Sequence, residues 1–254
     1  MIDILGRRAS AVLRRLALEG TWVALDFDGT LAPIVRDRDR AAMSARTRDT
    51  LFRLAERYPT VIVSGRARED VAGRLCGAPV KLVFGNHGAE GGLKDARTRA
   101  RLRREIRAVK NVLVAALEGV EGVEIEDKRY SLSVHDRKAE DPEVARAAIA
   151  EAVAALGASV RVEPGKRVTN VVHVDAPDKG TVVRALHESR GAARIVFVGD
   201  DVTDESVFRI RASWLVSVRV GRSVRSDAPY FVPTRAHVDV LCEALVDARI
   251  GLGR

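Results

Sequence analysis

Cysteine, aromatic residues and long apolar runs are all scarce in this sequence. The two cysteines, Cys76 and Cys242, lie far apart and in no metal-ligand spacing, so neither a disulfide framework nor a zinc site has support. Aromatic residues make up 4% of the chain, too few for a platform that stacks single-stranded bases. No apolar run of about 18 residues could span a membrane, and residues 1–20 lack the apolar segment of a secretory signal. We therefore expect a cytoplasmic enzyme or binding protein that makes no membrane contact.

The positive charge of the chain is distributed rather than clustered. Lysine and arginine number 43 against 35 acidic residues, a formal net charge of +8, and only seven of the 43 are lysine. Charge of this sign can attract nucleic acid, an anionic membrane or a small acidic substrate. Because the basic residues are spread along the chain, we interpret the charge as a solvated, arginine-rich surface and expect no nucleic-acid partner.

Short apolar runs alternate with helical patterns in the first and last thirds of the 254 residues. The runs TWVALDF, TVIV, VKLVF, RIVFVG and WLVSVRV each end in a turn signal and indicate buried strands. Helices are expected over 2–19, 44–57, 178–190 and 234–248, and another opens at TDESVFRI with Thr203 as its cap. This alternation is typical of a parallel sheet covered on both faces. The fold class is therefore α/β, with a Rossmann-like, doubly wound core.

The middle of the chain has a different pattern. A charged helix is expected over 95–118, strands with one exposed face from Val123, a second helix over 142–156, and a hairpin in SVRVEPGKRVTNVVHV. Helix, strands, helix and strands in this order indicate an inserted α+β domain. The expected division is a core of residues 1–92 and 176–254, interrupted by a cap domain of residues 93–175.

Carboxylates follow two of the expected strands. VALDFDGT places Asp26 and Asp28 two residues apart, so in extended geometry both side chains face one side. An isolated pair of this kind would more often cap a turn. Here Asp200 and Asp201 end another strand, and ligands of such sheets bind at the carboxyl ends of the strands. Buried carboxylates repel one another unless a cation neutralises them, so these residues and Asp204 predict a site for Mg²⁺.

The same groups suit phosphoryl transfer. A carboxylate can attack phosphorus and form an aspartyl-phosphate, and a second carboxylate can protonate the leaving oxygen and then activate water. Ser64 ends the second strand and Lys179 precedes a helix, so these two can hold phosphoryl oxygens by a hydrogen bond and by charge. The sequence has neither G-x-x-x-x-G-K-[ST] nor G-x-G-x-x-G, so a nucleotide-binding loop has no support.

Four motifs, DFDGT, SGR, DKG and GDDVTDE, occur in the order and approximate spacing of the haloacid-dehalogenase-like phosphohydrolases. The sequence resembles that superfamily over nearly its whole length. The resemblance implies that Asp26 is the nucleophile and Asp28 the general acid/base. It implies that Ser64 and Lys179 bind phosphate. The Mg²⁺ ligands that it implies are Asp26, the Asp28 carbonyl group and Asp200, with Asp201 and Asp204 in support.

One branch of the superfamily is matched in more detail. The sequence resembles the trehalose-6-phosphate phosphatases in DFDGTLAPI, VSGR, GNHGAE, EDKRYSLSVHDR and GDDVTDESVF. That resemblance implies hydrolysis of trehalose 6-phosphate to trehalose and phosphate. The residues that it places at the sugar or its phosphate are Glu126, Lys128, His135 and Arg137 from the cap, and Arg66, Asn86 and His87 from the core.

The segment before DKG departs from the family pattern. The family usually has a glutamate where this chain has Asn170. Asparagine keeps a carbonyl acceptor, loses the charge and adds N–H donors, and the nearby Glu163 is a candidate to compensate. A different glycosyl phosphate, or a phosphorylated pseudodisaccharide, therefore stays open as the substrate.

Other classes of protein stay open as alternatives. A phosphomutase would use the same aspartyl-phosphate, whereas a sugar-phosphate sensor or a basic nucleic-acid binder would need no catalytic set. The intact motifs favour an enzyme. We expect a monomer acting on a small sugar phosphate, with a cap that closes about hinges near Gly91 and Pro177 to exclude water.

Overall fold

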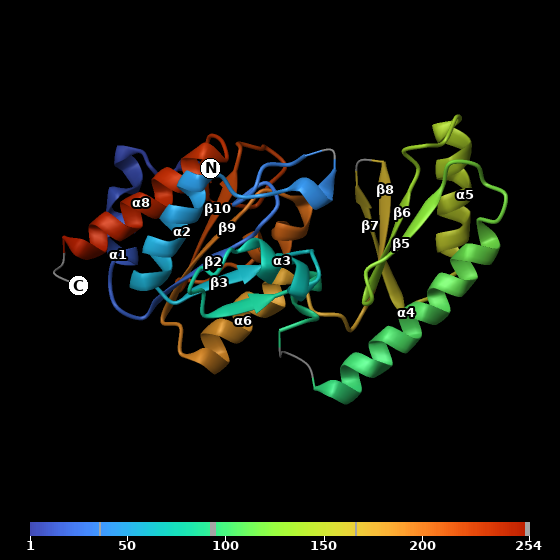
Figure 1. Ribbon diagram of the computed structural model, residues 1–254, viewed down its shortest axis with the longest axis horizontal. Coiled ribbons are helices and arrows are strands. Elements are labelled where there is room, and N and C mark those ends of the chain that lie inside the picture. The colour runs from blue at the N-terminus through green and yellow to red at the C-terminus, as the bar shows by residue number, and fades with distance from the viewer. Residues whose placement is uncertain (36, 92–94, 166, 252–254) are drawn as a thin grey trace. The chain divides into compact units, whose positions relative to one another are not determined.

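Two compact units make up the chain in the computed structural model, which describes residues 1–35, 37–91, 95–165 and 167–251 (Figure 1). One unit consists of Met1–Leu93 with Pro177–Arg254 and the other of Lys94–Ala176. We call the first the core unit and the second the insert unit. None of the helices in the described residues has both the length and the apolar content that a membrane span requires.

The sheet of the core unit is parallel throughout the described residues and has the strand order β1-β11-β10-β9-β2-β3-β4. β2 is flanked on both sides, because Leu25 is paired with Val198 of β9 and with Ile62 of β3. In sheet order, the strands are Ile2–Asp3, Tyr230–Val232, Leu215–Val220, Arg194–Gly199, Thr21–Leu25, Thr60–Val63 and Leu82–Phe84.

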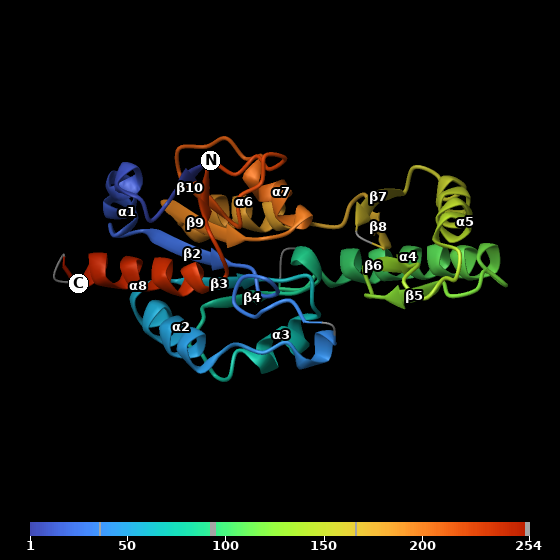
Figure 2. The same cartoon turned by 90° about the horizontal axis from the view of Figure 1, so that it is seen from above.

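Helices cover both faces of this sheet. Successive side chains of a strand point to opposite faces, and each face packs with helix residues in its own apolar cluster. All five residues of β2 are buried; Val23 and Leu25 belong to one cluster, and Trp22 and Ala24 to the other. Burial of an aliphatic side chain of this size stabilises the fold by about 1.5–3 kcal/mol. Figure 2 shows α2 and α3 on one side of the strands and α6 and α7 on the other. The first cluster includes residues of α1 (Ser10–Leu16), α2 (Ala45–Arg57), α3 (Arg68–Arg74) and α8 (Ala236–Ile250), and the second includes residues of α6 (Lys179–Arg190) and α7 (Glu205–Phe208).

The insert unit has an antiparallel sheet with helices on one face. Its strand order is β5-β6-β8-β7, with bounds Glu124–Asp127, Ser131–His135, Val168–His173 and Val160–Gly165. Leu132 and Val134 of β6 pack in one apolar cluster with Ile106 of α4 (Ala96–Ala116) and Ile149 of α5 (Pro142–Ala154). Because strand side chains alternate, the opposite face of this sheet carries the polar residues of the same strands.

The expected α/β core is confirmed, and the differences from expectation lie at its edges. Residues 2–19 were expected as one helix, and that expectation is wrong over its first half. Instead, β1 joins the edge of the sheet, where Ile2 N donates to Pro229 O and Ile4 N to Phe231 O. A 3₁₀ turn, Arg7–Ala9, then leads into α1. The short strand β11 and helix α3 were not anticipated.

The capping role expected for Thr203 is also wrong. Thr203 lies inside a 3₁₀ turn, Val202–Asp204, that precedes the four-residue α7. Asp201 caps that turn, and Asp204 Oδ2 accepts a hydrogen bond from Asp201 N at 2.9 Å. An acidic side chain in the first turn of a short helical segment can accept a hydrogen bond from the backbone N–H of the capping residue. The spacing of the sequence did not show whether Asp201 or Thr203 would be that capping residue.

Candidate active site

Three strand ends bring the expected catalytic groups of the core unit together. Asp26 follows β2, Ser64 follows β3 and Asp200 follows β9, and these strands are neighbours in the sheet. Asp26 N donates to Val198 O, so strand-like pairing continues to the residue that carries the first carboxylate. Asp26 is 4% exposed and Ser64 is fully buried. The carboxyl edge of the sheet is therefore the place where these polar groups are withdrawn from water.

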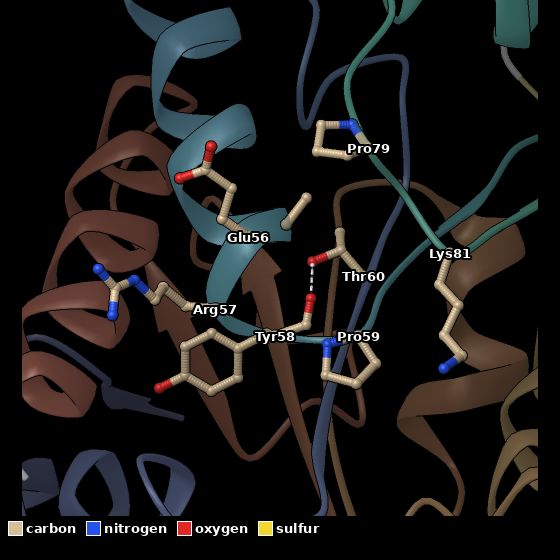
Figure 3. A pocket seen from close by; sticks show the side chains of 8 residues that line it. Glu56, Arg57, Tyr58, Pro59, Thr60, Pro79 and Lys81 are labelled. Atoms are coloured by element: carbon tan, nitrogen blue, oxygen red, sulfur yellow. Dashed lines mark hydrogen bonds between the residues drawn. The ribbon is translucent and has the colours of Figure 1, made fainter. Parts of the chain in front are cut away.

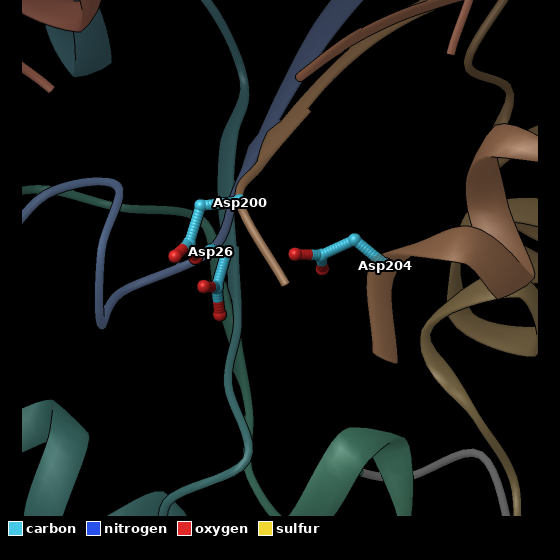
Figure 4. A group of neighbouring side chains, drawn as sticks. All are labelled: Asp26, Asp200 and Asp204. Carbon is cyan, nitrogen blue, oxygen red and sulfur yellow. The ribbon is translucent and has the colours of Figure 1, made fainter. Parts of the chain in front are cut away.

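Asp26, Asp200 and Asp204 form a cluster in which one carboxylate oxygen of each lies within 4.8 Å of the others. Figure 4 shows the Asp204 carboxylate, from the 3₁₀ turn, directed toward the other two. The Asp28 carboxylate is not a member of this cluster. Five residues were expected at the metal, and the structure brings the side chains of three of them, Asp26, Asp200 and Asp204, close together. Asp201 is exposed and contributes its backbone N–H to Asp204 instead.

Two glycines allow these carboxylates to approach the backbone. Gly29 has φ +80°, and a Cβ there would lie 2.0 Å from Asp200 Oδ2. At the end of β9, a Cβ on Gly199 would lie 2.4 Å from Asp204 Cγ. Any side chain at either position would displace a carboxylate of the cluster, which explains the glycines in DFDGT and VGDD.

Lys179 supplies positive charge to this cluster. It is the first residue of α6 and is 2% exposed; its Nζ donates to Asp26 Oδ1 and to Asp204 Oδ1, both at 2.7 Å. The side chain of Asp178 caps the helix by accepting from Thr181 N, which fixes the chain from which Lys179 extends. Burial alone would lower the pKa of the Lys179 ammonium, but Asp204 and Asp26 raise it. Lys179 therefore remains charged.

One ammonium does not balance three carboxylates, of which Asp26 and Asp204 are buried and Asp200 is half-buried. Burial raises the pKa of Asp26 well above its ordinary value, and the repulsion of Asp204 and Asp200 adds to this against the attraction of Lys179. Burial, followed by Asp204, raises the pKa of Asp200 to about 7. Among the described residues, the buried Asp200 Oδ1 has no hydrogen-bond partner. Oxygen donors with excess negative charge and an unused lone pair fit a hard divalent cation.

Arg66 is buried and bonded to two carboxylates. Its side chain is 3% exposed, and it clamps Asp28 through Nε to Oδ2 and Nη2 to Oδ1, both at 2.7 Å. Its Nη1 donates to Asp70 Oδ2 at 3.0 Å. Burial lowers the pKa of the Arg66 guanidinium, but the hydrogen bonds to Asp28 and Asp70 outweigh it and raise that pKa. The structure thus joins Arg66 to the expected acid/base residue.

The loops after β3 and β4 interlock at the same edge. Asn86 N donates to Arg66 O, His87 N donates to Ser64 O, and Ser64 Oγ accepts from Arg66 N. Asn86 and His87 have φ of 47° and 56°, a left-handed conformation that these side chains tolerate at tight turns. The buried Asn86 Nδ2 has no hydrogen-bond partner among the described residues, and neither does the buried Thr30 Oγ1. Thr30, the last residue of DFDGT, was not singled out from sequence, although its place in the motif was a usable signal.

Several residues that were expected to bind the sugar lie in one row on the polar face of the insert sheet. Glu126 is paired with Ser133, Ser133 with Asn170, and Asn170 with Glu163, so the four residues cross the sheet on one side. Ser133 Oγ donates to Asn170 Oδ1 at 2.6 Å. Ser133 was missed from sequence, because only the strand register places it between Glu126 and Asn170.

Charged residues flank this row. His135 Nε2 lies 3.1 Å and Lys128 Nζ 3.7 Å from Glu126 Oε2, while Arg161 donates to Glu163 Oε1 at 3.0 Å. Arg137 lies in an exposed turn after β6 and is not part of the row.

A hollow of about 370 Å³ lies at the other edge of the core sheet (Figure 3). It is formed where α2 ends and β3 begins, between Glu56 and Lys81. Thr60, the first residue of β3, donates there to Tyr58 O at 3.0 Å. Because Ser64 follows the opposite end of β3, this hollow is separated from the carboxylates by the length of the strand.

Comparison with known proteins finds relatives that are named trehalose-phosphate phosphatases. The profile of the trehalose-phosphatase family matches residues 24–234. A trehalose 6-phosphate phosphatase of Zea mays is 32% identical over 212 residues, covering 73% of this chain and 58% of that protein. A trehalose-phosphate phosphatase of Mycobacterium avium is 35% identical over 198 residues, covering 73% of this chain and 50% of that protein. The chain therefore spans between half and three fifths of these relatives.

Solved structures show the same architecture. A trehalose-6-phosphate phosphatase of Aspergillus fumigatus superposes with a TM-score of 0.70 at 26% identity, covering 98% of this chain and 100% of that one. The sucrose-phosphatase of Synechocystis, with a TM-score of 0.58 at 16% identity, shares the fold over 91% of this chain and 98% of its own. Taken with the family profile over residues 24–234 and relatives above 30% identity, these matches show that the chain belongs to the trehalose-phosphatase family.

Proposed function

We propose that this chain hydrolyses trehalose 6-phosphate to trehalose and inorganic phosphate, with Asp26 as the nucleophile. One observation carries the proposal: a buried carboxylate at the end of a central strand, with Oδ1 held by Lys179 at 2.7 Å beside two further carboxylates. The hydrogen bond from Lys179 goes to Oδ1, and among the described residues no side chain donates to Asp26 Oδ2. Oδ2 is therefore the oxygen that would attack. Family membership over residues 24–234 supports the choice of substrate.

The chemistry needs two steps, each balanced in protons. In the first, Asp26 attacks phosphorus, the bond from phosphorus to the sugar oxygen breaks, and Asp28 gives that oxygen a proton. In the second, water attacks the aspartyl-phosphate, Asp28 takes a water proton, and Asp26 is released with inorganic phosphate. Lys179 stabilises the phosphoryl oxygens by charge. Ser64 Oγ already accepts from Arg66 N, so its own hydrogen can be donated to a phosphoryl oxygen.

We propose Mg²⁺ as the cation of this site. Asp26, Asp200 and the Asp28 carbonyl group would hold it, with Asp204 beside them and Asp201 holding Asp204 through its backbone N–H. When bound, the cation would neutralise the carboxylates and polarise the phosphoryl group. The excess negative charge and the unpaired Asp200 Oδ1 support this assignment.

We propose that the insert unit, expected as residues 93–175, is a mobile cap that recognises the sugar. Its aligned row offers carboxylate and amide groups of the kind that bind sugar hydroxyls. Asn86 and His87 remain proposed substrate contacts on the core unit, whereas Arg66 is reassigned to Asp28. All these groups come from one chain, so a monomer suffices. The residues proposed to bind sugar or phosphate from the insert unit are Glu126, Lys128, His135, Arg137, Glu163 and Asn170.

A second substrate class is favoured by one residue. Asn170 Oδ1 accepts from Ser133, so its Nδ2 is the group left to meet a ligand. An amide N–H donates where a glutamate would accept, and a phosphorylated pseudodisaccharide or another glycosyl phosphate could supply the matching acceptor.

Phosphate release tests both candidates. The substrates are trehalose 6-phosphate, glucose 6-phosphate, sucrose 6-phosphate and an aryl phosphate, each with Mg²⁺, and Asp26→Asn is the matched control. We expect the highest kcat/KM for trehalose 6-phosphate and no turnover by Asp26→Asn. Full activity in a folded Asp26→Asn variant would refute the nucleophile, and activity on the aryl phosphate alone would redirect the search to another sugar.

A further inference from the structure

We infer that Asp70, acting through Arg66, is a positioning residue that orients the Asp28 carboxylate; this inference rests on the proposed function of Asp28. The side chain of Asp28 is 40% exposed, whereas that of Arg66, which binds it, is 3% exposed. An exposed carboxylate on a loop has rotational freedom unless something fixes it. The buried guanidinium does so with two parallel hydrogen bonds of 2.7 Å.

Asp70 fixes the guanidinium in turn. Arg66, Asp70 and Arg74 are spaced four residues apart, and Asp70 and Arg74 lie on one face of α3. Asp70 Oδ2 accepts from Arg66 Nη1 at 3.0 Å, and its Oδ1 accepts from Arg74 Nε at 2.8 Å. Because the guanidinium is planar and rigid, a partner on the Nη1 edge sets the direction of the edge that meets Asp28.

Arg74 anchors the far end of this network. Its Nη1 donates to Asp39 O at 2.9 Å and to Ala41 O at 2.7 Å. Charges alternate along the network from Asp28 to Arg74, so Arg66 and Asp70 each lie between two groups of opposite charge. The hydrogen bonds therefore run without a break from the proposed acid/base residue to the backbone of the segment before α2.

This arrangement suits both proposed steps. Each carboxylate oxygen has two lone pairs, so Asp28 can accept from Arg66 and still carry or take the proton that moves. Proton transfer falls off steeply when the group is misplaced, and a displacement of an ångström can cost about 100-fold in rate. Asp70 does not reach the substrate site itself, because its carboxylate is occupied by two arginines. Replacement of Asp70 is therefore expected to lower kcat and to leave KM unchanged.

The test compares Asp70→Asn with Glu243→Gln, which breaks another arginine–carboxylate pair of the core unit, that of Arg46. With trehalose 6-phosphate we expect kcat of Asp70→Asn to fall about 10-fold with KM unchanged, and both parameters to stay at wild type in Glu243→Gln. An aryl leaving group needs no proton from Asp28. For 4-nitrophenyl phosphate we therefore expect the first release of nitrophenolate at the wild-type rate and slower turnover after it.

A second variant covers poor folding of the first. Arg74→Gln leaves the Arg66–Asp70 contact in place but removes its anchor, and we expect the same pattern with a smaller fall in kcat. Wild-type kcat in folded Asp70→Asn, or a change confined to KM, would overturn the inference. If the wild-type protein hydrolyses none of the esters, the proposed function fails. The positioning inference is then judged from the thermal unfolding of Asp28→Asn, Asp70→Asn and the double variant, where additive shifts would overturn it.

Discussion

Replacement of Lys179 by methionine tests whether the carboxylate cluster is held by charge. Lys179 is 2% exposed, and its partners Asp26 and Asp204 are 6% and 0% exposed in their side chains. At 2.7 Å and an effective dielectric constant of about 20, each contact is worth about 6 kcal/mol before desolvation offsets most of it. Removing one partner of such a buried pair typically costs about 3–5 kcal/mol, because the remaining charge stays buried without compensation.

We therefore expect Lys179→Met to lower the free energy of unfolding by about 3–5 kcal/mol in EDTA at neutral pH. Saturating Mg²⁺ should restore part of this loss, since a cation that binds only the folded state stabilises it by about 2.7 kcal/mol at one hundred times its Kd. Urea unfolding with and without Mg²⁺ measures both values.

A matched control is Lys138→Met, which removes an ion pair to Glu124 of 2.6 Å on the surface. The distance is as short as in the cluster, but the Lys138 side chain is 70% exposed, so we expect no measurable change in stability. A loss below about 1 kcal/mol in Lys179→Met, or one that Mg²⁺ leaves unaltered, would refute the reasoning.

Three further substitutions test other contacts of the chain. Gly29→Ala should destabilise the protein by more than about 1 kcal/mol and weaken Mg²⁺ binding by calorimetry, because its Cβ would meet Asp200 Oδ2 at a positive φ. Tyr58→Phe removes a buried hydroxyl that donates to a backbone carbonyl of α8, at a cost of about 1–3 kcal/mol in urea unfolding. Burial raises the pKa of Tyr58 to about 12, so wild-type stability should fall between pH 10 and 12 as the unfolded state loses its proton first, and this fall should be smaller in Tyr58→Phe. Ser133→Ala should raise KM for the sugar phosphate without changing kcat for an aryl phosphate, because Asn170 loses the partner that orients its amide.

Local patterns were sufficient to predict the central strands. After Thr21, every residue of β2 is apolar, and a short apolar run that ends in a turn signal is typical of a strand buried on both faces. The edge of the sheet could not be predicted in the same way. β1 has two residues and pairs with β11, more than 220 positions away, so its pairing leaves no periodic signal.

The contacts of the site depend on pairing between distant residues. The sequence placed Asp26, Ser64 and Asp200 at strand ends, and their gathering follows from the adjacency of β2, β3 and β9. The clamp of Arg66 on Asp28 joins residues 38 positions apart, and the spacing of the motifs does not indicate which way an arginine side chain turns. The place of Ser133 beside Asn170 required the register of an antiparallel sheet.

The central position of β2 has a consequence for hydrogen exchange. The amides of this strand are paired on both sides and covered by apolar clusters on both faces, so they are exposed only when the core unit opens as a whole. Edge strands such as β4 can fray at a lower free energy. Exchange in β2 should therefore report the global stability of the core unit. A variant destabilised outside the site would lose the position of Asp26 through complete unfolding events, and the molecules that remain folded would keep the geometry of the site.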